Sequence, residues 1–385
     1  MELSLGNVNI LIGANASGKS NFVRIFEFLR DIARDGLNKA ISKDEYKYIK
    51  NINSDELSIE IIFDFGSDEE KQKYSIFIKF KENEAGIEKI KEEIILSYKI
   101  LEPDSNKEFD SGTMIFSNNN GELDAKITSS IHNETPQETL DDFFKPYQNI
   151  IDIMKKKEEK FLLESPFSPV LFAKTYNPFS RIFTYDLDPQ LSKKAIPIDW
   201  SRELVKNGEN LVNVVLNILI NPEKKKMFMN LVSYLLPYVE DIEVDKSTET
   251  DFDLKIKEKY SGKYLPMQSI SDGTINALGL IVALYFEESP LIIIEEPDKG
   301  FHPSLISRVI GMMKDAAEYG NKQIIVTTHS PEMVKHADPK NVLLVYRDDN
   351  GFSHITRPYR KKDVKIFLEN GMRLSDLYVD ELLEI

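Results

Sequence analysis

An octapeptide near the start of the chain has the residues and spacing of a phosphate-binding loop. Residues 13–20 read Gly13-Ala14-Asn15-Ala16-Ser17-Gly18-Lys19-Ser20, which fits the pattern G-x-x-x-x-G-K-[ST]. The two glycines permit backbone angles that turn successive N–H groups toward one anion. Lys19 would bring a point charge to the β- and γ-phosphates of a nucleotide, and Ser20 would offer its hydroxyl to Mg²⁺. Asn21, the next residue, is included among the predicted nucleotide-binding positions.

Two carboxylates follow a short apolar run in the last third of the chain. The run 291–294 is Leu-Ile-Ile-Ile, and Glu295, Glu296 and Pro297 come directly after it. Ligands of a parallel sheet lie beyond the carboxyl ends of its strands, so these acids are expected beside a bound phosphate. Glu295 would then hold Mg²⁺, and Glu296 would polarise the attacking water. Two solvated acids at the end of a strand are the alternative interpretation.

A histidine follows the next apolar run. Residues 323–328 are Gln-Ile-Ile-Val-Thr-Thr, and His329 comes directly after them as one of only five histidines in the chain. An imidazole there is able to hydrogen-bond a γ-phosphate oxygen or the attacking water. The alternative is a structural histidine that caps the end of a strand.

A polar turn opens an apolar stretch about twenty residues before the two carboxylates. It consists of Ser271, Asp272 and Gly273, and the apolar residues of a predicted helix follow. Ser271 is suited to cap the first turn of that helix. The backbone amides at such a helix start also form an anion site. An ordinary helix cap is the competing interpretation of this turn.

The elements around these residues are predicted to form a parallel sheet. The run 7–12 is a buried strand that leads into the glycine loop, and a helix follows from about Lys19. The runs 291–294 and 323–328 are separated by a helical stretch at 303–319, which is a βαβ pattern and implies parallel strands. The nucleotide loop, the carboxylates and His329 would therefore all lie at one edge of a single sheet.

The rest of the chain alternates between strand and helix patterns. Residues 57–65, 74–80 and 94–101 alternate as antiparallel strands do, and 117–122 is a polar turn. Helical character is predicted for 137–163 and again after Pro197, with a turn at 185–189 between them. Hairpins are predicted at 239–257 and at 342–356, the second around Asp348-Asp349-Asn350-Gly351. An amphipathic helix is predicted for 364–383.

Composition excludes several classes of protein. The chain has 385 residues, of which 41% are hydrophobic, and no run approaches the roughly 18 apolar residues of a membrane span. It has no cysteine, so disulfides and thiolate chemistry are excluded, and a cytoplasmic location is expected. The first residues lack the basic and apolar regions of a signal peptide. The net charge of −15 argues against passive coating of DNA.

The ordered set of motifs resembles the ABC-type ATPase heads of the SMC, RecF and OLD group, and in particular the predicted AAA family ATPases of bacteria and archaea. In that resemblance Gly13–Ser20 is the Walker A loop, Ser271–Thr274 the signature motif, Leu291–Glu296 the Walker B strand and His329 the switch histidine. The resemblance covers essentially the whole chain. The implied fold is α/β: a P-loop NTPase head with a mixed or parallel core sheet, an antiparallel β subdomain and a helical insert.

The resemblance also implies how such a protein works. Two heads would enclose two ATP molecules with Mg²⁺, and Ser271 and Gly273 of one subunit would contact the γ-phosphate held by the other. One composite ATPase domain is expected over 1–385, with a Walker A half at 1–116, a mainly helical lobe at 117–240 and the remaining motifs at 241–385. OLD-type nucleases continue into a Toprim domain, whereas the residues after His329 indicate only a hairpin and a helix.

Three functions compete at this stage. The first is an ATPase that dimerises around ATP and drives a separately encoded effector in DNA maintenance or anti-phage defence. The second is an ATP-gated dimeric scaffold that hydrolyses negligibly, which ATP-dependent dimerisation without turnover would reveal. The third is the nucleotide-binding subunit of a membrane transporter, which co-purification with a membrane protein would reveal.

Overall fold

The chain divides into two compact units, which we call the P-loop unit and the insert unit. The P-loop unit consists of Met1–Val23 and Arg181–Ile385, and the insert unit of Arg24–Ser180. This division differs from the segments 1–116, 117–240 and 241–385, which stay a prediction. A computed structural model describes residues 3–42, 58–65, 72–80, 87–101, 108–129, 145, 148–150, 152–153, 162–165, 177–197, 199–246, 248 and 251–383.

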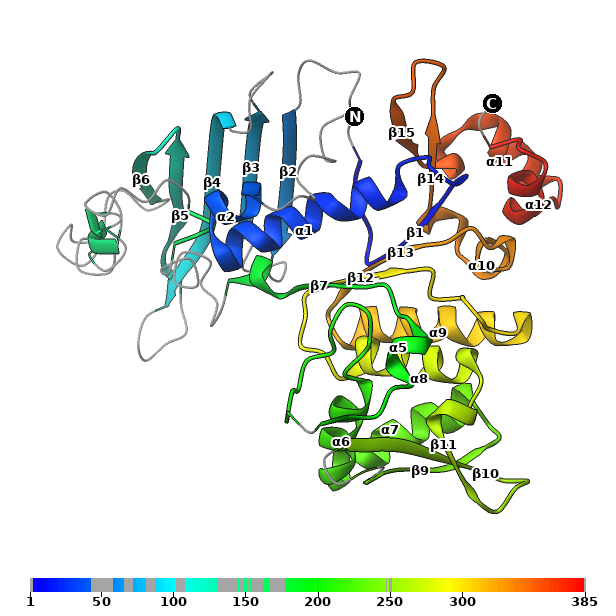
Figure 1. Cartoon of the computed structure of the whole chain (residues 1–385). Helices are drawn as coiled ribbons and strands as arrows, with labels where there is room; N and C mark the ends of the chain where they lie inside the picture. The colour runs from blue at the N-terminus through cyan, green and yellow to red at the C-terminus, as the bar shows by residue number, and fades with distance from the viewer. Residues whose placement is uncertain are drawn as a thin grey trace. The chain divides into compact units, whose positions relative to one another are not determined.

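A six-stranded sheet forms the centre of the P-loop unit (Figure 1). Its strands lie in the order β15-β14-β1-β13-β12-β7, and every neighbouring pair is parallel except β14 and β15. The predicted mixed, mostly parallel sheet is therefore confirmed. The strands are β1 (Val8–Ile12), β7 (Ile182–Tyr185), β12 (Leu291–Glu295), β13 (Gln323–Thr327), β14 (Val342–Arg347) and β15 (Ser353–Thr356).

Helices cover this sheet, which explains why its central strands are apolar throughout. β1 is buried along its whole length, and β12 is buried up to Ile294. Helix α9 (Pro303–Tyr319) contacts β1 and β13, and it also packs against α8 (Asp272–Tyr285). The predicted βαβ unit of β12, α9 and β13 is confirmed.

A smaller layer of the P-loop unit contains two helices and a second sheet. Helices α6 (Leu211–Ile220) and α7 (Pro222–Leu235) precede the hairpin of β9 (Val239–Lys246) and β10 (Asp251–Glu258), which confirms the hairpin prediction. Strands β8 (Ile196–Pro197) and β11 (Tyr264–Pro266) also pair with β10. The short helix α5 (Pro189–Ser192) follows β7.

The prediction that a helix begins soon after Pro197 is wrong, because α6 begins only at Leu211. Side chains of α6 hold the preceding residues in an irregular path. The Asn213 side-chain amide donates to Asp199 Oδ1 at 2.7 Å, and that of Asn217 donates to Ser201 O at 2.7 Å. Such side-chain bonds compete with helical hydrogen bonds.

The C-terminal stretch contains two helices where one was predicted. Helix α11 (Lys362–Glu369) ends before Asn370, and α12 (Leu374–Val379) begins four residues later. Gly371 has φ +85°, a left-handed conformation that glycine adopts without strain and that ends a helix. Before these helices, β14 and β15 pair antiparallel, which confirms the hairpin predicted around Asp348–Gly351.

The insert unit contains the antiparallel subdomain expected from the alternating sequence. Its strands pair with their neighbours in chain order from β2 to β6, and the predicted polar turn lies at Asn120-Gly121. Strands β5 and β6 were not predicted, and the helical stretch 137–163 lies largely outside the described residues. The strands are β2 (Ser58–Phe65), β3 (Gln72–Phe80), β4 (Ile87–Leu101), β5 (Glu108–Asn119) and β6 (Glu122–Ser129), and α2 (Leu37–Ser42) follows α1 (Lys19–Asp35).

A buried carboxylate organises the core of the insert unit. Glu92 is 2% exposed, and its oxygens accept hydrogen bonds from the Tyr74 hydroxyl, the Asn118 amide and the backbone N–H groups of Leu162 and Leu163. Burial raises the pKa of Glu92, although these donors partly oppose the effect. The carboxylate thus ties residues 162–163 to the sheet, because an unpaired buried acid is costly.

A second buried carboxylate lies in the P-loop unit, between α8 and β12. Glu287 is 3% exposed, and its Oε1 accepts the Leu204 N–H at 2.6 Å. Burial is the main cause that raises the pKa of Glu287 to about 7. The folded protein therefore holds a proton on Glu287 over a pH range in which the unfolded chain has already lost it.

Replacing Glu287 with glutamine is expected to flatten the dependence of stability on pH. Between about pH 4.5 and 7 only the unfolded wild type releases this proton, so wild-type stability falls as the pH rises, by up to about 3 kcal/mol. Glutamine keeps an oxygen for the Leu204 N–H and has no proton to lose. Urea unfolding of both proteins at pH 5 and pH 8 measures the difference. Glu288→Gln, at an exposed neighbour, is the control, and equal pH slopes for wild type and Glu287→Gln would contradict the prediction.

Candidate nucleotide-binding site

The loop between β1 and α1 has the backbone that the glycine pattern predicts. Gly13 has φ +152° and Gly18 has φ +113°, a region that side chains disfavour. A Cβ on Gly13 would overlap the Val345 carbonyl oxygen, and one on Gly18 would overlap the side chain of Ser353. Glycine is thus required at both positions by conformation and by space.

Polar groups inside the loop are arranged to meet an anion. Ser17 is 4% exposed, and its buried hydroxyl has no hydrogen-bond partner among the described residues. An orphaned buried donor of this kind calls for a ligand, since leaving it unpaired costs free energy. Helix α1 begins at Lys19, so its first N–H groups and its dipole face the same space. The loop therefore fits a phosphate group.

Lys19 is held inside the loop by its backbone. The side chain is buried, and its Nζ donates to the carbonyl oxygens of Gly13 and Ala14, each at 2.9 Å. Burial lowers the pKa of Lys19, and the negative charges of Glu296 and Glu295 partly restore it. A buried cation with two carbonyl partners can exchange them for phosphate oxygens with little new desolvation.

The predicted metal residues meet across the sheet. β13 lies between β1 and β12, yet the Ser20 hydroxyl reaches Glu295 and donates to its Oε2 at 3.2 Å. A hydroxyl and a carboxylate supply the oxygen ligands that Mg²⁺ takes, so the residues fit that ion. Among the described residues no group of three or more His, Cys, Asp or Glu side chains could hold a metal. Bound phosphate would have to complete the coordination, as it does for Mg²⁺ with nucleotides.

Glu296 and His329 lie next to each other at the same edge of the sheet. His329 Nε2 is 3.5 Å from Glu296 Oε1, and both side chains are partly exposed. Glu296 has φ +45°, and its N–H donates to the Thr327 carbonyl oxygen at 2.8 Å. A strained backbone that is tied to the next strand indicates that the direction of this side chain is fixed by the fold.

Asp298 is a neighbouring acid that sequence reasoning missed. Its Oδ1 accepts a hydrogen bond from the Thr328 hydroxyl at 2.8 Å, which joins the residue before His329 to the loop after Glu296. Burial raises the pKa of Asp298. Its position two residues after Glu296 was the only signal in the sequence, and that signal does not reveal burial.

The Ser271 turn caps α8, as predicted. Ser271 Oγ accepts the Thr274 N–H at 3.2 Å, and the two hydroxyls lie 2.7 Å apart. Asp272 forms an ion pair with Lys193, and a Cβ on Gly273 would overlap the Gly300 carbonyl oxygen. These contacts lead to α5 and to the loop after β12, and none of them reaches residues 13–20. Ser271, Asp272 and Gly273 are thus separate from the site that the other predicted residues form.

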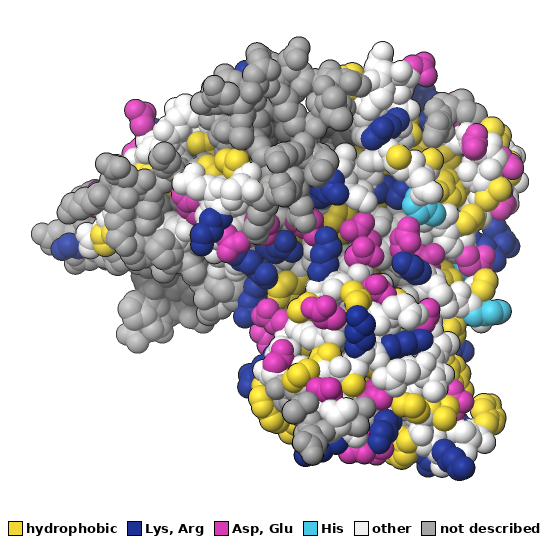
Figure 2. All heavy atoms as spheres, viewed as in Figure 1, with side chains coloured by type: hydrophobic (Ala, Val, Ile, Leu, Met, Phe, Trp, Pro, Cys, Tyr) yellow, Lys and Arg dark blue, Asp and Glu magenta, His cyan; other side chains and the backbone are white. Residues whose placement is uncertain are grey.

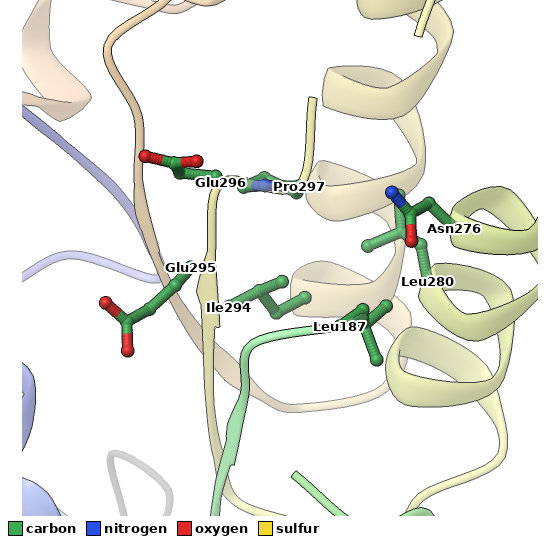
Figure 3. Close-up of a pocket in the computed structure, with 7 residues that line it drawn as sticks. All are labelled: Leu187, Asn276, Leu280, Ile294, Glu295, Glu296 and Pro297. Carbon is green, nitrogen blue, oxygen red and sulfur yellow. The ribbon is translucent and has the colours of Figure 1, made fainter. Parts of the chain in front are cut away.

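A small pocket lies between α8 and β12. It is lined by Leu187, Asn276, Leu280, Ile294, Glu295, Glu296 and Pro297. In Figure 3 the carboxylates of Glu295 and Glu296 point away from α8, whereas Leu187, Asn276 and Leu280 lie on the opposite side of β12. The Asn276 amide donates to the Lys299 carbonyl oxygen at 2.9 Å, so α8 also holds the loop that follows the acids.

Residues 8–335 match one family model, described as "AAA domain, putative AbiEii toxin, Type IV TA system". The chain belongs to this family. The predicted membership of the AAA ATPases is thereby confirmed, and nucleotide binding by this AAA domain follows from it. None of the curated proteins matches the sequence. Among the described residues, none of the helices combines the length and apolar character that crossing a membrane requires.

Solved structures of Smc head domains align with the AAA domain along most of its length. One is an SmcHead bound to the C-winged helix domain of ScpA, with 14% identity, a TM-score of 0.42 and coverage of 92% of this chain and 91% of that chain. Another, from Thermotoga maritima, has 13% identity, a TM-score of 0.37 and coverage of 92% and 91%. These low scores add no weight to the family assignment, which rests on the family model.

Proposed function

We propose that this AAA domain hydrolyses ATP and dimerises around it, so that the nucleotide acts as a switch for a partner protein. The observation that carries the proposal is the meeting of Ser20 with Glu295 beside the buried Lys19. Lys19 and Ser20 begin helix α1 and Glu295 ends β12, and together they offer two metal ligands and a cation that binds phosphate in one place. Glu296 and His329 add a base and a hydrogen-bonding partner for water.

Ser20 and Glu295 are the residues that would hold Mg²⁺, which supplies charge neutralisation to the phosphates when it is bound. Lys19 binds the phosphates, and the N–H groups of the loop orient them. Glu296 takes a proton from the attacking water, while His329 positions that water or a phosphate oxygen. Every one of these groups, side chain or backbone, is proposed to act at the carboxyl edge of the central sheet.

The homodimer is proposed because the site lacks its signature motif within one chain. Ser271 and Gly273 contact other parts of the P-loop unit, and they carry helix-start amides suited to an anion. In a two-fold symmetric dimer, each chain would bring its Ser271 and Gly273 to the nucleotide bound by the other chain, so both sites would be completed.

The partner that responds to dimerisation is proposed to be a protein encoded separately from this chain. Basic and acidic side chains are interspersed on the face in view (Figure 2), and the net charge is −15. Such a surface favours a protein partner over a long contact with DNA backbone. The family description names a putative toxin and a type IV TA system, and the role that we propose for the switch is in anti-phage defence or DNA maintenance.

Light scattering with and without ATP and Mg²⁺ tests the proposal. The expected result is a molar mass that doubles when nucleotide is added. Lys19→Ala should remain a monomer because it loses the ammonium group that binds the phosphates. A monomer at saturating ATP, with calorimetry showing that ATP is bound, would contradict the dimer. Dimerisation without any release of phosphate would instead favour a scaffold that does not turn over.

A further inference from the structure

The β14–β15 hairpin lies directly against the phosphate-binding loop. The register places Ile12 opposite Leu344, so β14 continues beside the start of the loop. The Val345 carbonyl oxygen occupies the space beside Gly13, and the Ser353 side chain occupies the space beside Gly18. The hairpin thus contacts both obligatory glycines, one through each of its strands.

The order of the strands gives the bound nucleotide a direction. β1 has β13 on one side and β14 on the other, and the acids that serve the γ-phosphate end follow β12, beyond β13. A nucleotide whose γ-phosphate faces Glu296 must extend its other end away from β12. Within the central sheet, the strands on that side of the loop are those of the β14–β15 hairpin, and Tyr378 of α12 also contacts the backbone of Gly13.

One face of the hairpin is directed at the loop. Arg347 and Ser353 are a directly paired couple across the two strands, so their side chains lie on the same face of the hairpin. Ser353 packs on Gly18, which places Arg347 on the face that borders the loop. Arg347 is exposed, and the structure gives it no ion pair among the described residues.

The other face of the hairpin is fixed internally. His354 Nε2 lies 2.9 Å from Asp348 Oδ2, and the rings of Tyr346 and His354 stack at 5.5 Å. These contacts hold the two strands together at the level of Arg347. A rigid platform that presents a planar guanidinium is well suited to stack on a purine ring.

We infer that the β14–β15 hairpin forms the nucleoside side of the site and that Arg347 stacks on the base. The inference rests on the proposed function, because it assumes that residues 13–20 hold the phosphates. It makes Arg347 a determinant of affinity for the whole nucleotide and leaves the binding of a bare phosphate chain to the loop.

Calorimetry with two ligands, AMP-PNP and tripolyphosphate, tests the inference. Arg347→Ala should weaken AMP-PNP binding about tenfold and leave tripolyphosphate within about twofold of wild type. Arg347→Lys keeps the charge without the planar group, so it should resemble Arg347→Ala. Arg202→Ala, at an exposed arginine in the loop before α6, is the matched control and should bind both ligands as the wild type does.

The possible outcomes separate this inference from the proposed function. If Arg347→Lys regains wild-type affinity, or if tripolyphosphate binding falls in parallel, Arg347 acts as a point charge on phosphate and the stacking role is overturned. Unchanged AMP-PNP affinity in Arg347→Ala also overturns it. If the wild type itself binds neither ligand, the proposed function fails, whatever the variants do.

Discussion

Replacing Glu296 with glutamine is expected to lower the rate of ATP hydrolysis by at least about 100-fold while ATP binding stays within a few-fold of wild type. Glutamine has the same shape but cannot take a proton from water. The fold keeps its anchor, because the hydrogen bond from residue 296 to Thr327 is made by the backbone. Phosphate release and calorimetry with ATP measure the two quantities.

A matched control separates this effect from a general loss of structure. Glu288 is a glutamate in the same unit whose side chain is 88% exposed, so Glu288→Gln makes the same chemical change away from the site. We expect it to hydrolyse ATP at the wild-type rate. A Glu296→Gln protein that keeps more than about a tenth of the wild-type rate would exclude Glu296 as the general base.

The Glu296→Gln variant should accumulate as the ATP-bound dimer. If hydrolysis separates the two subunits, a chain that binds ATP without cleaving it stays dimeric in ATP and Mg²⁺. Light scattering should then show a dimer for Glu296→Gln over hours, while the wild type returns to monomer as its ATP is consumed. Equal lifetimes for the two dimers, with wild-type turnover present, would contradict the link between hydrolysis and opening.

The core of the site could be predicted because its signals are local. The glycines and Lys19 lie within eight residues, and the strand before them and the helix after them are visible in the sequence. Glu295, Glu296 and His329 each follow a strand, so a parallel sheet had to bring them to one edge. The structure does bring them together, through the 3.2 Å contact of Ser20 with Glu295 and the 3.5 Å approach of His329 to Glu296.

Other features depend on tertiary contacts that no local pattern contains. Glu92 and Glu287 are glutamates like many others in the sequence, and only the fold reveals that they are buried. The packing of Ser353 on Gly18 joins residues 335 positions apart, which is why the role of the hairpin could not be predicted. The break at Gly371 is different, since Asn370-Gly371 was a legible helix-end signal that the amphipathic pattern masked.

Two inactive variants are expected to restore each other if the site is shared between chains. Lys19→Ala removes the ammonium group that binds the phosphates. Ser271→Asp places a negative charge beside the γ-phosphate of the nucleotide that the partner chain binds. Aspartate caps a helix as well as serine does, so α8 should keep its first turn. Each protein alone is expected to hydrolyse ATP at less than about 1% of the wild-type rate, as loss of an electrostatic contact to the reacting group predicts.

A mixed dimer of the two variants has one complete site. The loop of the Ser271→Asp chain meets the intact Ser271 of the Lys19→Ala chain, while the second site carries both defects. Because Lys19→Ala does not dimerise by itself, its dimers in the mixture are mixed ones, each with one of two sites complete, so an equal mixture should recover about a quarter to a half of the wild-type rate. Phosphate release from the two proteins, measured separately and together, gives this value.

The charge-matched control is Asn221→Asp. Asn221 caps α7 by accepting the N–H groups of Glu223 and Lys224, so aspartate there adds the same charge at another helix start of the same unit. It should hydrolyse ATP as the wild type does. Recovery in the mixture requires that Ser271 act on the nucleotide of the other chain, because a Ser271 that served its own loop would leave both sites of every mixed dimer dead. An inactive mixture, with mixed dimers detected by native mass spectrometry, would therefore place Ser271 outside the shared site.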